Sequence, residues 1–353
     1  MTAPTPTELT YPDIEAAAAR IAGRVRPVTV APAQPGTLAE AASPTAATWS
    51  SGPAEDPNAS GLLFALEFMQ YTGTFKARGA QNFIQSHLAE GTFPEAGVTI
   101  ASGGNAGLAC AWAARAAQVP ATVFLPTTAP SVKVERLRSY GARVEFVGSE
   151  FAEAAAACHA FVASSGALAS HAYDHPFIAA GAGTLMTEIL AQVPDLDTVV
   201  VSVGGGGLFA GVATAATYHG VRTVAVEPKN CRALGAALEA GGPVDVTVDS
   251  VAADSLGARR ATPLAVAAAQ SDLVTSVLVD DEAIIAARTR LWDEHRLAVE
   301  HAAATALAGV SGAGDSKTEV GGNVDGTTDG YVPAVGEKVC VVLCGANTDL
   351  SDL

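Results

Sequence analysis

The segment TVVVSVGGGGLFAG, residues 198–211, combines three kinds of local structure in one short stretch. Its first six residues are a continuous apolar run rich in β-branched valine, which is typical of a strand buried on both faces. Gly204 to Gly207 follow, and an alanine-rich helical pattern starts at Leu208. A strand, a glycine turn and a helix in this order predict one unit of a parallel sheet.

The same alternation of strand and helix occurs along most of the chain. It predicts an α/β fold of two lobes, with open, twisted, mostly parallel sheets that carry helices on both faces. Asp280 or Asp281 is suited to cap one of the helices, and the Gly-, Asp- and Thr-rich residues 311–336 predict a long surface loop. The other predicted strands are VTIAS (98–102), ATVFLP (121–126), ARVEFVG (142–148), ALASHAYD (167–174), VRTVAVEP (221–228), LVTSVLV (273–279) and EKVCVVLCGAN (337–347).

Composition restricts the class of protein. The chain has 353 residues, of which 49% are hydrophobic and 16% charged, so a large core is expected. The net charge of −16 disfavours binding to nucleic acid or to anionic membrane surfaces. Five cysteines without CxxC spacing, no signal peptide and no membrane-spanning run predict a cytoplasmic protein with reduced thiols.

Three polar or glycine-rich turns follow predicted strands: SGGNAG after residue 101, GGGG after residue 203 and CGAN after residue 343. Open parallel sheets bind ligands beyond the carboxyl ends of their strands. We therefore expect the three turns to converge on one site.

The glycine turn at residues 204–207 supports two ligand hypotheses. Backbone N–H groups at a helix start can hold a phosphate, and an ordinary tight turn is the structural alternative. Gly205, Gly207 and Ala210 also match the dinucleotide fingerprint, with Glu227 at the position of a ribose-binding acid. That second hypothesis, a nicotinamide-dependent dehydrogenase, leaves the other two turns without a role.

Two further stretches carry candidate chemistry. TGTFKARGA (72–80) surrounds Lys76 with apolar and small residues. A lysine is usually solvated, but an amine among apolar groups has a lowered pKa and can act as a nucleophile and a base. In ASGGNAG (101–107), Ser102 and Asn105 stand among glycines at a helix start, where a carboxylate can bind or where either residue can cap the helix.

With TGTFKARGA, SGGNAG, GGGG and LCGAN in this order, the chain resembles the pyridoxal-phosphate enzymes of the tryptophan-synthase β group, fold type II. DHPFIAAGAGT (174–184) and ADSLGARR (253–260) are similar to its serine/threonine dehydratase and serine racemase branch. The resemblance implies a large cofactor-binding domain, residues 1–96 plus 171–353. It also implies a small domain, residues 97–170, that supplies the substrate loop.

The resemblance also implies individual roles. Lys76 corresponds to the lysine that forms the Schiff base with pyridoxal 5'-phosphate and then removes the substrate Cα proton. The implied cofactor contacts are Phe75 beneath the ring, Asn105 at the ring hydroxyl, Gly204, Gly205, Gly206 and Gly207 at the phosphate, Leu208 after them, and Cys344 at the pyridine nitrogen. The implied substrate-carboxylate loop is Ser102, Gly103, Gly104, Asn105 and Ala106.

The chain departs from this branch at two positions. Racemases have a second serine where this sequence has Gly103, which cannot carry a proton, so racemisation is disfavoured. The branch binds a divalent metal through an acid at the position of Glu227 and a polar residue at the position of Ala233. No metal site is therefore assigned, and a monovalent cation held by Glu227 and backbone carbonyls is left open.

The function predicted is an ammonia-lyase that converts serine or threonine into a 2-oxo acid and ammonia, and the family implies a homodimer. Hydroxyaspartate dehydratase, racemase and β-replacement chemistry on the same fold are the alternatives kept open, as are the dehydrogenase and a non-catalytic binding protein. Arg259 or Arg260 would be needed to bind the second carboxylate of a hydroxyaspartate.

Overall fold

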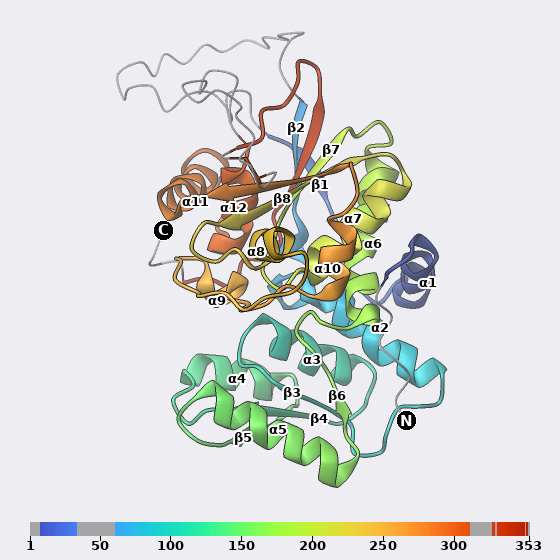
Figure 1. Cartoon of the computed structure of the whole chain (residues 1–353). Helices are drawn as coiled ribbons and strands as arrows, with labels where there is room; N and C mark the ends of the chain where they lie inside the picture. Colours follow the sequence, from blue (N-terminus) through green and yellow to red (C-terminus); the bar gives the residue numbers. More distant parts are fainter. Residues whose placement is uncertain (1–7, 34–60, 311–326, 329, 350, 352–353) are drawn as a thin grey trace.

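The computed structural model describes residues 8–33, 61–310, 327–328, 330–349 and 351, and most of the predicted surface loop 311–336 lies outside these ranges. The described chain forms two sheets, one above the other in Figure 1. All strand pairs are parallel except β1 with β2, so the predicted mostly parallel α/β architecture is confirmed.

The larger sheet has seven strands, and its centre is fully buried. Every residue of β7 and all but the first residue of β8 are buried, because helices cover both faces of the sheet (Figure 1). In spatial order the strands are β1 (Val30–Pro32), β2 (Gly61–Ala65), β11 (Lys338–Val342), β7 (Thr198–Ser202), β8 (Arg222–Pro228), β9 (Val274–Val279) and β10 (Thr327–Thr328).

The smaller sheet takes all its strands from one continuous part of the chain. In spatial order they are β5 (Arg143–Phe146), β4 (Ala121–Leu125), β3 (Val98–Ala101) and β6 (Leu168–Ala169). β6 is much shorter than predicted, because the chain turns at His171. There Nδ1 of the imidazole accepts the backbone N–H groups of Tyr173 and Asp174. Strands β1 and β2 were not among the predicted strands.

The helices begin where their sequences favour it. His175 caps α6 by accepting the Phe177 N–H. Helix α11 begins directly after Asp280, as predicted, but the Asp280 side chain makes no capping hydrogen bond, and the Asp281 carboxylate accepts from Ser250 and Val251 instead. None of the described helices is long and apolar enough to cross a membrane. The helices are α1 (Tyr11–Ile21), η1 (Glu67–Met69), η2 (Tyr71–Gly73), α2 (Lys76–Ala89), α3 (Asn105–Ala116), α4 (Ser131–Ser139), α5 (Phe151–Ser165), α6 (Pro176–Gln192), α7 (Gly207–Tyr218), α8 (Ala233–Ala240), α9 (Ala253–Leu256), α10 (Pro263–Ala268), α11 (Asp281–His295) and α12 (His301–Ala308).

Each sheet has its own hydrophobic core. The core of the smaller sheet also includes Phe83 and Ile84 of α2 and Ile178 of α6, which the predicted domain division assigns to the large domain. Helix α2 therefore packs against both parts of the molecule. The domain boundaries at residues 96 and 171 stay a prediction.

Candidate active site

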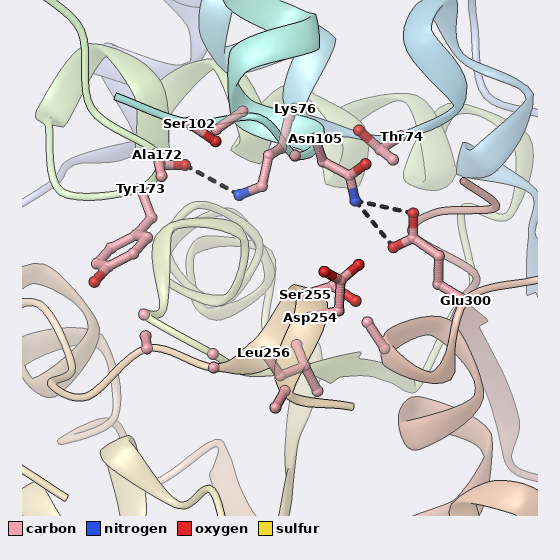
Figure 2. Close-up of a pocket in the computed structure, with 18 of the residues that line it drawn as sticks. Thr74, Lys76, Ser102, Asn105, Ala172, Tyr173, Asp254, Ser255, Leu256 and Glu300 are labelled. Carbon is pink, nitrogen blue, oxygen red and sulfur yellow. Dashed lines mark hydrogen bonds between the residues drawn. The ribbon is translucent and has the colours of Figure 1, made fainter. Parts of the chain in front are cut away.

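A cavity of about 710 Å³ lies at the carboxyl ends of strands β3, β7 and β11, between the two sheets. The three turns singled out in the sequence all contribute residues to its wall, so their predicted convergence is confirmed. Figure 2 labels Ser102 and Asn105 of the first turn together with Lys76. Every residue that the resemblance assigned to cofactor or substrate is on its wall. These are Phe75, Lys76, Ser102, Gly103, Gly104, Asn105, Ala106, Gly204 to Gly207, Leu208 and Cys344.

Lys76 starts helix α2 and is half-buried, with its side chain on the cavity. Its Nζ donates a hydrogen bond to the Ala172 carbonyl at 3.0 Å and lies 4.7 Å from the centre of the Phe75 ring (Figure 2). Burial lowers the pKa of Lys76 from 10.5 to about 8, although Cys344 and Glu300 act in the opposite direction. The amine is therefore available in its neutral form near pH 8, as a nucleophile or base requires.

Backbone contacts fix the segment before Lys76. The Phe75 N–H donates to the Cys344 carbonyl at 3.0 Å, and Thr74 forms an antiparallel bridge with Gly345. These contacts tie the start of α2 to the end of β11. The cavity-lining hydroxyl of Thr74 is buried and has no hydrogen-bond partner among the described residues.

Arg78 anchors the same helix from its other side. Its guanidinium is completely buried and pairs with Glu67 at 2.7 Å and with Glu188 at 2.7 Å. It also donates to the Thr184 hydroxyl at 3.2 Å. Although burial opposes the charge, the two carboxylates raise the pKa of Arg78, so the arginine stays protonated. Lys76 thus stands on a helix whose first turn is held by a buried ionic cluster.

Glu300 was not predicted as a site residue. It directly precedes α12, is 7% exposed, and lies opposite Asn105 on the cavity wall (Figure 2). The Asn105 amide nitrogen donates to both Glu300 oxygens, at 2.9 and 3.0 Å, and the Asn347 N–H donates to Oε1 at 2.9 Å. Burial raises the pKa of Glu300 above 4.5, and these donors oppose the rise. Glu300 therefore orients Asn105.

The glycine turn is shaped by packing as well as by any ligand. Gly206 has a φ of +92°, and a Cβ there would lie 2.3 Å from the Cβ of Ala265. A Cβ on Gly205 would lie 2.3 Å from the Tyr173 ring, and one on Gly207 would lie 2.8 Å from the Tyr173 carbonyl oxygen. Close packing therefore explains in part why glycine occupies these positions. The turn still presents the first amides of α7 to the cavity, and those amides have no partner within the helix.

Cys344 lies at the cavity floor, 4% exposed, with its Sγ 3.7 Å from the Ser202 hydroxyl. Burial raises the pKa of Cys344 to about 12. The thiol is therefore neutral at physiological pH. A neutral group at this position matches the role that the resemblance implies.

Glu227 does not line the cavity. It is fully buried, and its two carboxylate oxygens accept the N–H groups of Leu234 and Gly235 at 2.8 Å each, at the start of α8. Burial raises its pKa to about 8. A carboxylate used in this way cannot also bind a ribose at the cavity, so the dinucleotide hypothesis is not supported.

Two other predicted groups are Glu227, for a cation, and Arg259 or Arg260, for a second carboxylate. The described residues contain no group of three His, Cys, Asp or Glu side chains arranged to hold a metal ion. The monovalent-cation role of Glu227 stays a prediction. Arg260 pairs with Asp245 on the surface at 2.8 Å and does not line the cavity, whereas Arg259 does.

The cavity fits a phosphorylated aldehyde cofactor. A phosphate needs convergent amides, which the glycine turn offers, and an aldehyde needs a neutral amine, which is Lys76. The unpaired Thr74 hydroxyl and the Asn105 side chain add hydrogen-bonding groups on the same wall. The two parallel sheets and this set of side chains define a cofactor-dependent α/β enzyme of fold type II.

The chain belongs to the family described as pyridoxal-phosphate dependent enzymes, whose model matches residues 38–345. It is 37% identical over 249 residues to an L-threonine ammonia-lyase of Geobacter sulfurreducens, covering 70% of this chain and 61% of the relative. It is 34% identical over 288 residues to a phenylserine dehydratase of Ralstonia pickettii, covering 81% and 82%. The similarity to the structure of maize serine racemase extends over 97% of this chain and 95% of the racemase chain, with 28% sequence identity and a TM-score of 0.79.

The chain spans only part of some of these relatives. It covers 61% of the Geobacter enzyme and 48% of an L-threonine dehydratase from Haemophilus influenzae, to which it is 37% identical over 246 residues.

Proposed function

We propose that this protein is a pyridoxal-phosphate-dependent ammonia-lyase that acts on β-hydroxy amino acids of the serine and threonine type. The product is a 2-oxo acid, released with ammonia after loss of the β-hydroxyl as water. The observation that carries the proposal is the position of Lys76. Its amine, with a pKa near 8, faces the cavity that the glycine turn and the Ser102–Asn105 turn also line. Relatives named as threonine ammonia-lyases support it.

The residues would share the work as follows. Gly204 to Gly207 would hold the phosphate through backbone amides, and Asn105, oriented by Glu300, would contact the ring oxygen. The neutral Cys344 thiol would contact the pyridine nitrogen without forcing a proton onto it. When bound, pyridoxal phosphate acts as an electron sink that makes the substrate Cα–H acidic.

The turn at residues 102–106 holds the substrate, and Lys76 deprotonates it. The backbone amides of residues 102–106 bind its carboxylate at the start of α3, where the helix dipole favours a negative charge. The neutral Nζ of Lys76 takes the Cα proton. Gly103 has no side chain that could return a proton from the opposite side, which favours elimination over racemisation.

A keto-acid release assay tests the proposal. Purified protein supplied with pyridoxal phosphate should release equal amounts of 2-oxo acid and ammonia from serine or threonine. Lys76→Ala and Lys76→Arg should abolish this release, whereas Lys338→Ala, on the surface beside Asp195, should not affect it. Full activity of Lys76→Ala would contradict the proposal. Bound cofactor without release from any amino acid would favour a non-catalytic binding protein.

We also propose that the protein is a cytoplasmic homodimer. It would bind an amino-acid substrate and no nucleic acid. The net charge of −16 supports the last point. Sedimentation at several protein concentrations would test the dimer. Assays with sodium and with potassium would test whether a monovalent cation changes the rate.

A further inference from the structure

The small-sheet side of the cavity presents an apolar wall. Leu125, at the end of β4, and Pro126, Ala129 and Phe151 all line the cavity on this side. Leu125 adjoins the substrate-carboxylate turn, since a Cβ built on Gly103 would lie 3.0 Å from its Cδ2 atom. The wall therefore begins where the substrate carboxylate is expected to bind and extends toward the cavity mouth.

Phe151 is the conspicuous member of this wall, because 63% of this large aromatic residue is exposed although it lines a cavity. It is the first residue of α5, and a capping box fixes that helix start. The Glu153 carboxylate accepts the backbone N–H groups of Ser149 at 2.7 Å and of Glu150 at 3.1 Å. The backbone at Phe151 is thus held in place while its ring is left uncovered.

The charges at the mouth do not favour an anionic group. Lys133 and Asp254 both line the cavity and pair with each other at 3.4 Å, so the lysine charge is already balanced. Glu300 adds one further carboxylate to the lining, and Arg259, an exposed residue, adds one further cation. The charged side chains on this part of the lining therefore balance one another and leave no excess positive charge that would select a second carboxylate.

We propose that the site prefers β-hydroxy amino acids whose β-carbon carries an aryl or bulky apolar group, and that Phe151 determines this preference. The inference rests on the proposed function. The carboxylate turn at Gly103 adjoins Leu125, so a large substituent on the substrate β-carbon would extend along the apolar wall that includes Leu125 and Phe151. Covering an exposed aromatic ring with a second apolar group is favourable, and a serine side chain cannot do so.

The test compares kcat/KM for four substrates, 3-phenylserine, threonine, serine and 3-hydroxyaspartate, each in all its stereoisomers. The wild-type holoenzyme should favour 3-phenylserine over serine by about tenfold or more. Phe151→Ala should lower kcat/KM for 3-phenylserine by about tenfold and change that for serine by less than about twofold. The matched control is Phe146→Ala, a partly exposed phenylalanine at the end of strand β5 that does not line the cavity and should change neither value. Thermal unfolding of both variants checks that they are folded.

Three outcomes would overturn the inference, and they separate it from the proposed function. Rapid turnover of serine or threonine with poor turnover of 3-phenylserine leaves the ammonia-lyase intact and removes the apolar preference. Preference for 3-hydroxyaspartate that is lost in Arg259→Gln would show that Arg259, and not the apolar wall, determines substrate specificity. Release of no 2-oxo acid from any of the four substrates rejects the proposed function itself.

Discussion

Asn105 and Glu300 are 195 residues apart in the chain, yet one amide nitrogen of Asn105 donates to both carboxylate oxygens of Glu300. The pair joins α3, beside the smaller sheet, to the start of α12, beside the larger one. Asn347 completes the group, since its side-chain nitrogen donates to the Asn105 oxygen at 2.9 Å. Both hydrogen-bonding ends of the Asn105 amide are therefore oriented before any ligand binds.

Removing the Glu300 carboxylate should misplace Asn105. We expect Glu300→Ala to lower kcat by up to about 100-fold, because small displacements in a site have effects of that size. Glu300→Gln keeps one acceptor oxygen and should lower kcat by a smaller factor. The absorption spectrum of the bound cofactor should change in both variants. Asp195→Ala, an exposed carboxylate outside the cavity, is the control. Wild-type kcat and spectrum in Glu300→Ala would contradict this role.

The reactivity of Lys76 should follow its lowered pKa. In the folded protein the pKa falls from 10.5 to about 8, so the neutral amine predominates above pH 8. When cofactor-free protein is mixed with pyridoxal phosphate, the rate of growth of the visible absorption band should be half-maximal near pH 8. A short lysine peptide with an acetylated N-terminus provides the reference and should respond near pH 10.5. A protein profile that coincides with that of the peptide would disprove the burial effect.

Adding one methyl group to the glycine turn should impair cofactor binding. In Gly206→Ala the new Cβ would meet Ala265 at 2.3 Å in a backbone conformation of φ +92°. We expect weaker affinity for pyridoxal phosphate in a fluorescence titration. Gly220→Ala is the control, because Gly220 also has a positive φ, +74°, but its Cβ would meet nothing within 4 Å. Equal cofactor affinities in the two variants would show that the turn geometry does not matter for binding.

Replacing Arg78 should destabilise the fold. Arg78→Met leaves the buried Glu67 without its partner and should reduce the free energy of unfolding by about 3–5 kcal/mol. Arg260→Met breaks the exposed pair with Asp245 and should cost about 1 kcal/mol or less. Urea unfolding measures both. Similar losses in the two variants would mean that the buried cluster contributes no more than a surface pair.

Acidic pH should weaken the hydrogen bond by which His175 caps helix α6. Burial, with smaller effects of His87 and His171, lowers the pKa of His175 from 6.5 to about 4. The unfolded chain therefore binds a proton first, so the stability that the neutral imidazole contributes is present above pH 6.5 and is lost as the pH falls toward 4. His175→Asn keeps a side-chain acceptor for the Phe177 N–H but does not titrate.

The fall in Tm between pH 7 and pH 5 should be smaller in His175→Asn than in the wild type. His219→Asn, at an exposed histidine after α7, should retain the wild-type fall. Identical pH dependence in all three proteins would assign acid instability to other groups.

Much of the fold could be predicted because its signals are local. The valine run of β7 and the glycines that follow it identify a buried parallel strand and a turn without knowledge of any neighbour. β1 has only three residues, and β2, GLLFA, is apolar but has no β-branched residue and no glycine turn after it. β2 is mostly buried only because it pairs with β11, more than 270 residues later in the chain. Its burial depends on a partner that periodicity cannot reveal.

The candidate site divides in the same way. Motif order placed Lys76, Asn105 and Cys344 on one cavity, because strand ends of parallel sheets converge. Glu227 matched a dinucleotide motif in spacing, but α8 folds back over it and takes up both of its oxygens.

Residue order and composition thus specified the strand–turn–helix units, the glycine turn and the amine most suited to covalent chemistry, since each depends on near neighbours in the chain. The pairing of Asn105 with Glu300, the burial of Glu227 and the exposure of Phe151 on the cavity emerged from folding. They arise where segments remote in sequence pack together, and packing determines which polar groups find partners and which apolar ones stay uncovered.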